Sequence, residues 1–215
     1  MRAVILANGV AGDLDFLRKG VSPRDALICC DGGARYAEAL GVLPDFLIGD
    51  MDSVLPETLE KYRAAGVRLV PAPSDKDYTD LELAIMLACQ LRADHIDIFG
   101  ALGGRMDHAM ANACVLLQAA GAARILEPGC AVYAAGAGRE LAISGNPGDI
   151  VSILPVKDTL VAETDGLAWP LARARLYPGY AVGMSNVMTS GAARISVETG
   201  ALIVFHNFHN LSHLE

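Results

Sequence analysis

The chain has 215 residues, of which 53% are hydrophobic and 20% are charged, and its formal net charge is −8. This length admits one large domain or two small ones, and the composition is too apolar for a disordered chain. The acidic balance and the absence of a Lys/Arg cluster argue against a nucleic-acid-binding protein. Phosphate ligands stay possible, because a metal ion and a few local cations can neutralise them.

The apolar run at residues 3–7 is too short for a signal peptide or a membrane span, and no apolar stretch reaches ~20 residues. We therefore expect a cytoplasmic protein with no membrane partner. The cysteines are odd in number, form no CxxC pair and lie in apolar segments: Cys29, Cys30, Cys89, Cys114 and Cys130. We interpret them as small core residues in a reducing compartment.

Residues 1–127 repeat one pattern, in which a short apolar run is followed by a loop with Gly or Asp and often by a helical stretch. Strands are predicted at residues 3–6, 26–30, 45–48, 67–70, 95–99 and 124–126, and helices at residues 35–40, 81–91 and 107–120. This alternation favours a mostly parallel sheet covered on both faces. We therefore expect an α/β domain over residues 1–127.

Helical periodicity stops after residues 127–129. Short strand-like runs follow at residues 131–134, 140–143, 149–155, 193–197 and 202–205. Such runs, separated by turn residues, are typical of a small antiparallel β-sandwich or barrel. A second domain is predicted over residues 128–215. The histidines of its tail, His206, His209 and His213, fit no zinc-binding spacing.

In open α/β sheets, ligands bind outside the carboxyl ends of the strands, so the loops there form the candidate site. The loop Gly49–Ser53 directly follows a predicted strand and carries Asp50 and Asp52. If the chain stays extended, residues i and i+2 point to the same side. Two carboxylates suit Mg²⁺, which binds hard oxygen ligands and usually keeps contacts to substrate phosphates. The alternative interpretation is an acidic surface turn.

A second polar loop precedes the predicted helix at residues 81–91. Thr79 and Glu82 fit a capping box, and Asp80 in the first turn suits the helix dipole. These structural roles leave Lys76 and Asp77 unexplained. A cation beside an acid at a helix N-terminus suits phosphate together with Mg²⁺.

A Gly-rich loop joins the strand at residues 95–99 to the helix that follows. Gly103 and Gly104 let backbone N–H groups approach a phosphate, and the start of a helix adds positive potential. Arg105 supplies a planar fork that matches phosphate oxygens, and Asp107 is a natural N-cap. The alternative is a tight turn with an ordinary cap. The loop matches neither the Walker A nor the GxGxxG pattern.

Asp31, Gly32 and Gly33 repeat the theme after the strand at residues 26–30, whereas a plain turn explains Asn8-Gly9. Each loop alone is weak. Together they bring several carboxylates, an arginine and several glycines to one edge of one predicted sheet. That constellation predicts a site for phosphates and metal.

These loops, in this order, resemble the thiamine pyrophosphokinase family. Its patterns DGG, GDxDS, KDxTD and GGRxDH match residues 31–33, 49–53, 76–80 and 103–108. The second half is similar as well: residues 164–169 match TxGLxW, and residues 185–186 match a Ser-Asn pair. The resemblance covers nearly the whole chain. It implies a Rossmann-like ATP domain, a β-sandwich domain and a homodimer, with thiamine between the ATP domain of one subunit and the β domain of the other.

The expected site has three parts. Mg²⁺ is assigned to Asp50, Asp52 and Asp77. ATP and its phosphates are assigned to Asp31, Gly32, Gly33, Lys76, Thr79, Asp80, Gly103, Gly104, Arg105 and His108. Asp107 either binds metal or caps its helix. The resemblance implies Trp169, Ser185 and Asn186 as thiamine contacts. Trp169 is the only Trp, and its ring suits a cationic thiazolium, although a core Trp is the alternative.

The predicted reaction is attack of the thiamine hydroxyl on the β-phosphorus of ATP, with diphosphate transferred in one step and AMP released. Positioning and charge neutralisation carry such chemistry, here through Asp50, Asp52, Asp77, Arg105 and Asp107. Two alternatives belong to other classes. One is an ATP- or GTP-dependent transferase for another alcohol. The other is a non-catalytic nucleotide sensor, which would not need the full set of acids.

Overall fold

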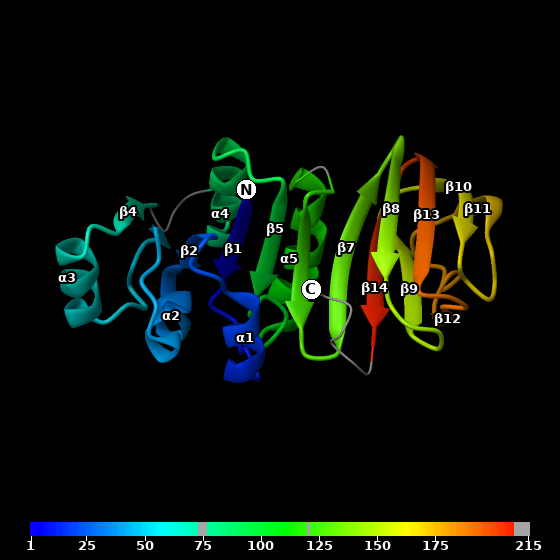
Figure 1. Ribbon diagram of the computed structural model, residues 1–215. Helices are drawn as coiled ribbons and strands as arrows, with labels where there is room; N and C mark the ends of the chain where they lie inside the picture. The colour runs from blue at the N-terminus through cyan, green and yellow to red at the C-terminus, as the bar shows by residue number, and fades with distance from the viewer. Residues whose placement is uncertain (73–76, 120, 209–215) are drawn as a thin grey trace. The chain divides into compact units, whose positions relative to one another are not determined.

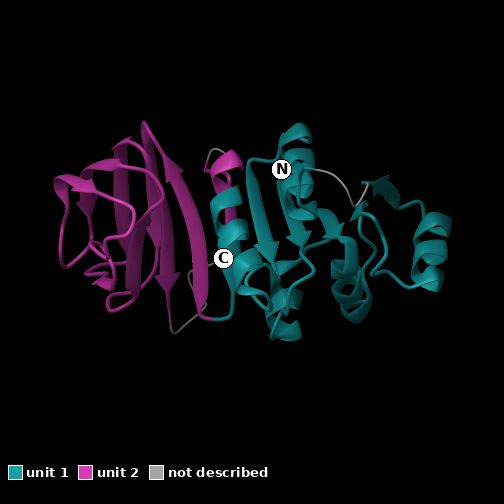
Figure 2. Cartoon of the chain, turned by 180° about the vertical axis from the view of Figure 1, so that it is seen from behind, with its two compact units in different colours: residues 1–115, 125–128 teal, residues 116–124, 129–215 magenta. Residues whose placement is uncertain are grey.

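The computed structural model of the protein describes residues 1–72, 77–119 and 121–208. The chain forms two compact units, which Figure 2 colours separately. Unit 1 comprises Met1–Val115 and Ile125–Pro128, and unit 2 comprises Leu116–Arg124 and Gly129–Glu215. In the part of the chain that the structure describes, no helix is long and apolar enough to cross a membrane.

Unit 1 is built on a sheet whose strands run side by side in Figure 1. They are β1 (Arg2–Leu6), β2 (Ala26–Cys30), β3 (Phe46–Gly49), β4 (Arg68–Pro71), β5 (His95–Phe99) and β6 (Ala123–Glu127), in the order β6-β5-β1-β2-β3-β4. The pairs β1–β2, β1–β5, β2–β3 and β3–β4 are parallel. Strands β1, β2 and β5 are buried at all but their first residue. This burial explains the apolar runs of β1 and β2, whereas β5 also buries Asp97, which pairs with Arg2.

The helical elements of the first half are α1 (Leu14–Gly20), η1 (Asp31–Gly33), α2 (Ala34–Leu40), α3 (Pro56–Ala64), α4 (Asp80–Gln90), α5 (Met106–Val115) and η2 (Leu116–Ala119). Helices α2 and α4 confirm the helices predicted at residues 35–40 and 81–91. The capping box of α4 is present, since Thr79 and Glu82 bond each other's backbone N–H groups. Helix α5 is shorter than predicted, because the chain tightens into the 3₁₀ turn η2 after Val115.

Unit 2 is β-rich, and its described residues after Gly129 contain no helix. Its strands are β7 (Cys130–Gly136), β8 (Arg139–Ser144), β9 (Ile150–Pro155), β10 (Thr159–Asp165), β11 (Ala172–Leu176), β12 (Asn186–Val187), β13 (Ala192–Thr199) and β14 (Ala201–Asn207). Their hydrogen-bonded orders are β12-β9-β14-β7 and β11-β10-β13-β8, through antiparallel pairs. Strands β10, β11 and β12 were not predicted.

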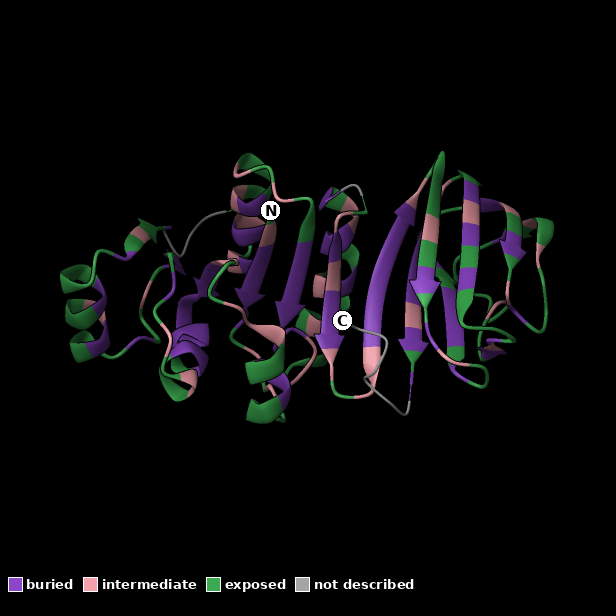
Figure 3. Cartoon of the chain, viewed as in Figure 1, coloured by how far each residue is buried: buried purple, intermediate pink, exposed green. Residues whose placement is uncertain are grey.

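Burial follows the two periodicities that the sequence suggests (Figure 3). Strand β13 buries Ala193, Ile195 and Val197, every second residue, as expected for a strand with one covered face. The prediction that all the cysteines are core residues is wrong for two of them. Cys29 and Cys30 are buried, and burial raises the pKa of the Cys29 thiol, but Cys89 and Cys114 are exposed. An apolar helical segment still has a solvent face, so it does not place every cysteine in the core.

His206 lies on β14 rather than in a polar tail. It is fully buried, and its Nε2 lies 2.9 Å from the Oδ2 of Asp149. The other tail histidines, His209 and His213, lie outside the described residues.

Candidate active site

Three carboxylates converge at the carboxyl ends of two neighbouring strands of unit 1. Asp31 directly follows β2, while Asp50 and Asp52 follow β3. Cys30 pairs with Ile48 in parallel register, so the two loops leave the sheet side by side. One oxygen from each carboxylate lies within 4.8 Å of the others. The structure therefore adds Asp31 to the pair of carboxylates, Asp50 and Asp52, that was expected to lie together.

The geometry of this group differs from the extended spacing expected of Asp50 and Asp52. Met51 between them has φ +64°, and the Asp52 N–H donates to Asp50 Oδ1 at 3.3 Å, so a turn and not a strand brings the acids together. Asp31 also has a left-handed φ of +43°. Two non-glycine residues in this region are typical of backbone strain held at functional sites.

Gly49 permits the close approach of the two loops. A Cβ at this position would lie 2.9 Å from Asp31 Cβ, and the residue has φ +142°. A side chain here would push Asp31 away from Asp50 and Asp52.

The three carboxylates fit a hard divalent cation. Asp31 is 5% exposed, and its Oδ1 is buried with no hydrogen-bond partner among the described residues. A buried oxygen of this kind is costly unless it is paired, and carboxylate oxygens are the ligands that Mg²⁺ prefers. Asp77, the third ligand expected from the sequence, is exposed and does not belong to the group.

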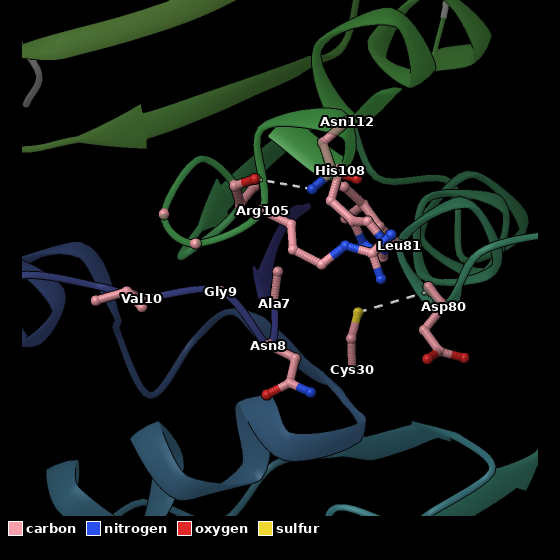
Figure 4. A pocket seen from close by; sticks show the side chains of 13 residues that line it. Ala7, Asn8, Gly9, Val10, Cys30, Asp80, Leu81, Arg105, His108 and Asn112 are labelled. Carbon is pink, nitrogen blue, oxygen red and sulfur yellow. Dashed lines mark hydrogen bonds between the residues drawn. The ribbon is translucent and has the colours of Figure 1, made fainter. Parts of the chain in front are cut away.

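A pocket of about 340 Å³ lies at the same edge of unit 1 (Figure 4). Its lining includes several of the expected phosphate-binding residues: Asp80, Gly103, Gly104, Arg105 and His108. Figure 4 shows the Arg105 side chain projecting into the pocket. Gly32, Gly33, Thr79 and Asp107 do not line it, and Lys76 lies outside the described residues.

A loop that its local sequence predicts to be a plain turn also belongs to the pocket. Asn8, Gly9 and Val10 form part of its lining. Arg35 donates to Asn8 Oδ1 at 2.5 Å, to the Asn8 carbonyl at 3.0 Å and to the Gly9 carbonyl at 2.7 Å. The Tyr36 hydroxyl donates to the same Gly9 carbonyl at 2.6 Å. The feature that identifies this loop is the pairing of Asn8 with Arg35 of α2, which no local sequence pattern shows.

Arg105 and Asp107 form a two-point ion pair. Arg105 Nε lies 3.1 Å from Asp107 Oδ1, and Nη2 lies 2.5 Å from Oδ2. The hydrogen bonds from Arg105 hold the pKa of Asp107 down at about 2, although the pair is exposed. Asp107 is not the N-cap of α5 as expected. The helix begins at Met106, which places Asp107 in its first turn, where it faces Arg105 instead.

In unit 2, the side chain of Asn186 joins two of the residues expected to contact thiamine, Asn186 itself and Trp169. The buried Asn186 accepts from the Trp169 N–H at 3.0 Å and donates to the Trp169 carbonyl at 2.6 Å. Trp169 itself is 61% exposed, which excludes the alternative of a core Trp. Ser185 is exposed, with φ +56°, and its N–H donates to Ser152 Oγ at 3.0 Å. The segment thus presents one indole ring on a fixed backbone.

Comparison with known proteins gives two family matches. Residues 17–126 match the model described as "Thiamin pyrophosphokinase, catalytic domain", and residues 140–204 match "Thiamin pyrophosphokinase, vitamin B1 binding domain". Thiamine pyrophosphokinase 1 of Oryza sativa subsp. japonica is 27% identical over 198 residues, which is 80% of this chain and 75% of the relative. Thiamine pyrophosphokinase of Bacillus subtilis is 36% identical over 78 residues, 36% of each chain.

Two solved structures share the fold. The thiamine pyrophosphokinase structure from Bacillus subtilis has a TM-score of 0.84 at 23% identity, covering 98% of this chain and all of that one. The yeast thiamin pyrophosphokinase structure has a TM-score of 0.73 at 18% identity, covering 97% of this chain and 86% of that one.

Proposed function

The chain belongs to the thiamin pyrophosphokinase family and is an enzyme that transfers diphosphate from ATP to thiamine, and on that premise we propose that Asp31, Asp50 and Asp52 hold the Mg²⁺ for this reaction. The observation that carries the proposal is the convergence of their oxygens within 4.8 Å around the unpaired Oδ1 of Asp31. When bound, Mg²⁺ supplies positive charge to the phosphate oxygens. Asp77 is a candidate for a further contact once substrate is present.

The pocket beside these acids is the proposed site of the ATP phosphates. Arg105 projects into it, and Gly103 and Gly104 let backbone approach the ligand. We propose that Lys76 and His108 also bind the ATP phosphates, Lys76 as a cation and His108 as a hydrogen-bond donor. Arg105 forms an ion pair with Asp107. We therefore propose that Asp107 orients the guanidinium of Arg105 before the phosphates bind.

Domain roles follow the order of the chain. We propose that residues 1–127 form a Rossmann-like ATP-binding domain and that residues 128–215 form a β-sandwich domain for thiamine binding and dimerisation. Thiamine stacks on the exposed Trp169 ring, with Ser185 beside it. Asn186 acts through Trp169, because its amide is already engaged by the backbone of that residue.

The remaining proposals concern assembly and compartment. Between residues 169 and 184, unit 2 exposes several large apolar side chains: Trp169, Tyr177, Tyr180, Val182 and Met184. Exposed apolar side chains of this size support burial against a second copy. We propose a homodimer that acts in the cytoplasm, and sedimentation of the pure protein tests the assembly.

Metal binding tests the function of the acids directly. Mn²⁺, followed by electron paramagnetic resonance, serves as a probe that titrates the same oxygen ligands. We expect Asp31→Asn and Asp52→Asn to weaken Mn²⁺ binding strongly, while Asp158→Asn, an exposed acid of unit 2, leaves it unchanged. Equal Mn²⁺ affinity in all three folded variants would remove the carboxylate group from the proposal.

A further inference from the structure

The Gly-rich loop after β5 is held by a carboxylate from another strand end. Glu127, the last residue of β6, accepts through one oxygen from the backbone N–H of Ala101 at 3.1 Å and of Leu102 at 3.3 Å. All three residues belong to unit 1. Glu127 does not line the pocket, whereas Ala101 does. We propose that Glu127 is a positioning residue, which holds the loop at residues 100–104 in its phosphate-binding shape before the nucleotide arrives.

The charge of Glu127 matches what this loop offers. Successive backbone N–H groups at the bend of a loop form a concavity that favours an anion. Here the protein's own carboxylate takes the N–H groups of Ala101 and Leu102. The loop is thereby divided by function: its first part is anchored to Glu127, and Gly103, Gly104 and Arg105 are left facing the pocket. The sequence-based prediction assigned Gly103, Gly104 and Arg105 to the phosphates and gave no role to Ala101 and Leu102.

Two further hydrogen bonds hold the same loop. Asn112 Nδ2 donates to the Ala101 carbonyl at 2.8 Å, and the Gly9 N–H donates to the Gly100 carbonyl at 2.8 Å. Ala101 is therefore bonded through both its N–H and its carbonyl. A loop fixed in this way presents its donors to the phosphates without reorganisation at the moment of reaction.

The burial of Glu127 affects the free energy of its charged form. Burial raises the pKa of Glu127, even though the hydrogen bonds from Leu102, Ala101 and Gly100 lower it. When the pKa of an acid is higher in the folded than in the unfolded protein, its protonated form favours folding. This contribution to the free energy of unfolding is present below the unfolded pKa and is lost as pH rises through the folded pKa. At neutral pH the charged form of Glu127 therefore favours folding less than its protonated form would. Replacing it with Gln should leave the melting temperature unchanged or raise it.

The inference rests on the proposed role of the loop in binding ATP, so the test has two stages. The first is hydrogen–deuterium exchange of the unliganded protein, comparing wild type with Glu127→Ala, Glu127→Gln and the exposed control Glu60→Gln. We expect faster exchange confined to the loop at residues 100–104 in Glu127→Ala. Glu127→Gln, which keeps an acceptor oxygen, should lie between, and Glu60→Gln should match wild type. An unchanged loop in Glu127→Ala, or a change spread equally over β1 and β5, would overturn the proposal.

The second stage measures steady-state kinetics on the same variants. We expect the KM for ATP to rise about tenfold or more in Glu127→Ala, the loss that accompanies about 1.4 kcal/mol, with the KM for thiamine unchanged. If the loop loosens and the KM for ATP does not move, the assignment of the loop to the phosphates is wrong. Glu127 would then remain the anchor of a loop with another task, so the two failures are distinguishable.

Discussion

Arg35 donates a 2.5 Å hydrogen bond to Oδ1 of Asn8 and thereby turns the Nδ2 of that amide toward Asp31 Oδ2, 3.4 Å away. A residue on the surface of α2 thus orients a loop that touches the carboxylate group. We expect Arg35→Ala to fold normally, because the side chain is exposed. Its kcat/KM for ATP should fall at least tenfold, since hydrogen bonds from charged donors each contribute roughly 1.5–3 kcal/mol.

Arg18→Ala provides the matched control for this prediction. Arg18 is also exposed and helical. Its described ion pair is with Asp15, and neither residue lines the pocket. If Arg18→Ala and Arg35→Ala lose activity equally, then the link from Arg35 through Asn8 has no role in positioning.

The pair of Arg105 with Asp107 predicts a strong response to a conservative change. Arg105→Lys keeps the charge but loses the two-point fork, so we expect turnover to fall roughly 10²–10³-fold, as when one preorganised donor is removed. Turnover equal to wild type would reduce Arg105 to a bulk cation.

The same pair predicts a titration. Arg105 holds the pKa of Asp107 at about 2. Any stability that the pair contributes is therefore fully present above the ordinary Asp pKa, and it is lost as pH falls from there through the lowered pKa of about 2. In Arg105→Gln, the pKa of Asp107 should return toward its ordinary range. Carbon-13 NMR of the Asp107 carboxyl measures this directly, and an unmoved pKa would show that Arg105 is not its cause.

Trp169 and Asn186 should respond differently to truncation. Trp169→Ala removes an exposed ring, so we expect little change in melting temperature and a KM for thiamine raised a few-fold to about thirty-fold, the range of a lost cation–π contact. Asn186→Ala leaves backbone groups of Trp169 without partners, at roughly 1–3 kcal/mol each. It should therefore lower the melting temperature and raise the KM for thiamine together.

Fluorescence provides the independent check, because Trp169 is the only Trp. Saturating thiamine, added with Mg²⁺ and a non-hydrolysable ATP analogue, should change its emission. An unchanged emission, with an unchanged KM in Trp169→Ala, would leave the acceptor site elsewhere.

Sequence patterns predicted most strands of unit 1, because buried parallel strands read as unbroken apolar runs. They missed α3, in which only Thr58 and Tyr62 are buried, so its apolar periodicity is weak. They missed β10 as well, whose pairing with β13 contains register shifts that break its alternation. In both cases tertiary packing, and not local pattern, decides the structure.

The sequence indicated which residues of the candidate site converge where these residues are close in sequence, and missed them where they are not. Asp50 and Asp52 stood out by spacing, although a turn and not an extended strand brings them together. Asp31 joins them only because β2 and β3 are neighbours, and Glu127 reaches the Gly-rich loop from another strand end. Strand order is a property of the folded chain, so no single motif contains these contacts.

We propose that a diphosphate group passes from ATP to thiamine in one step at the carboxylates Asp31, Asp50 and Asp52. Phosphorus-31 NMR of ATP, thiamine and Mg²⁺ with wild type and with Asp52→Asn tests it most directly. We predict that wild type forms AMP and thiamine diphosphate in equal amounts, without ADP. Asp52→Asn, whose side chain is exposed, should melt like wild type and form almost none of either product. Accumulation of ADP, or AMP formed at nearly the wild-type rate by folded Asp52→Asn, would contradict the account.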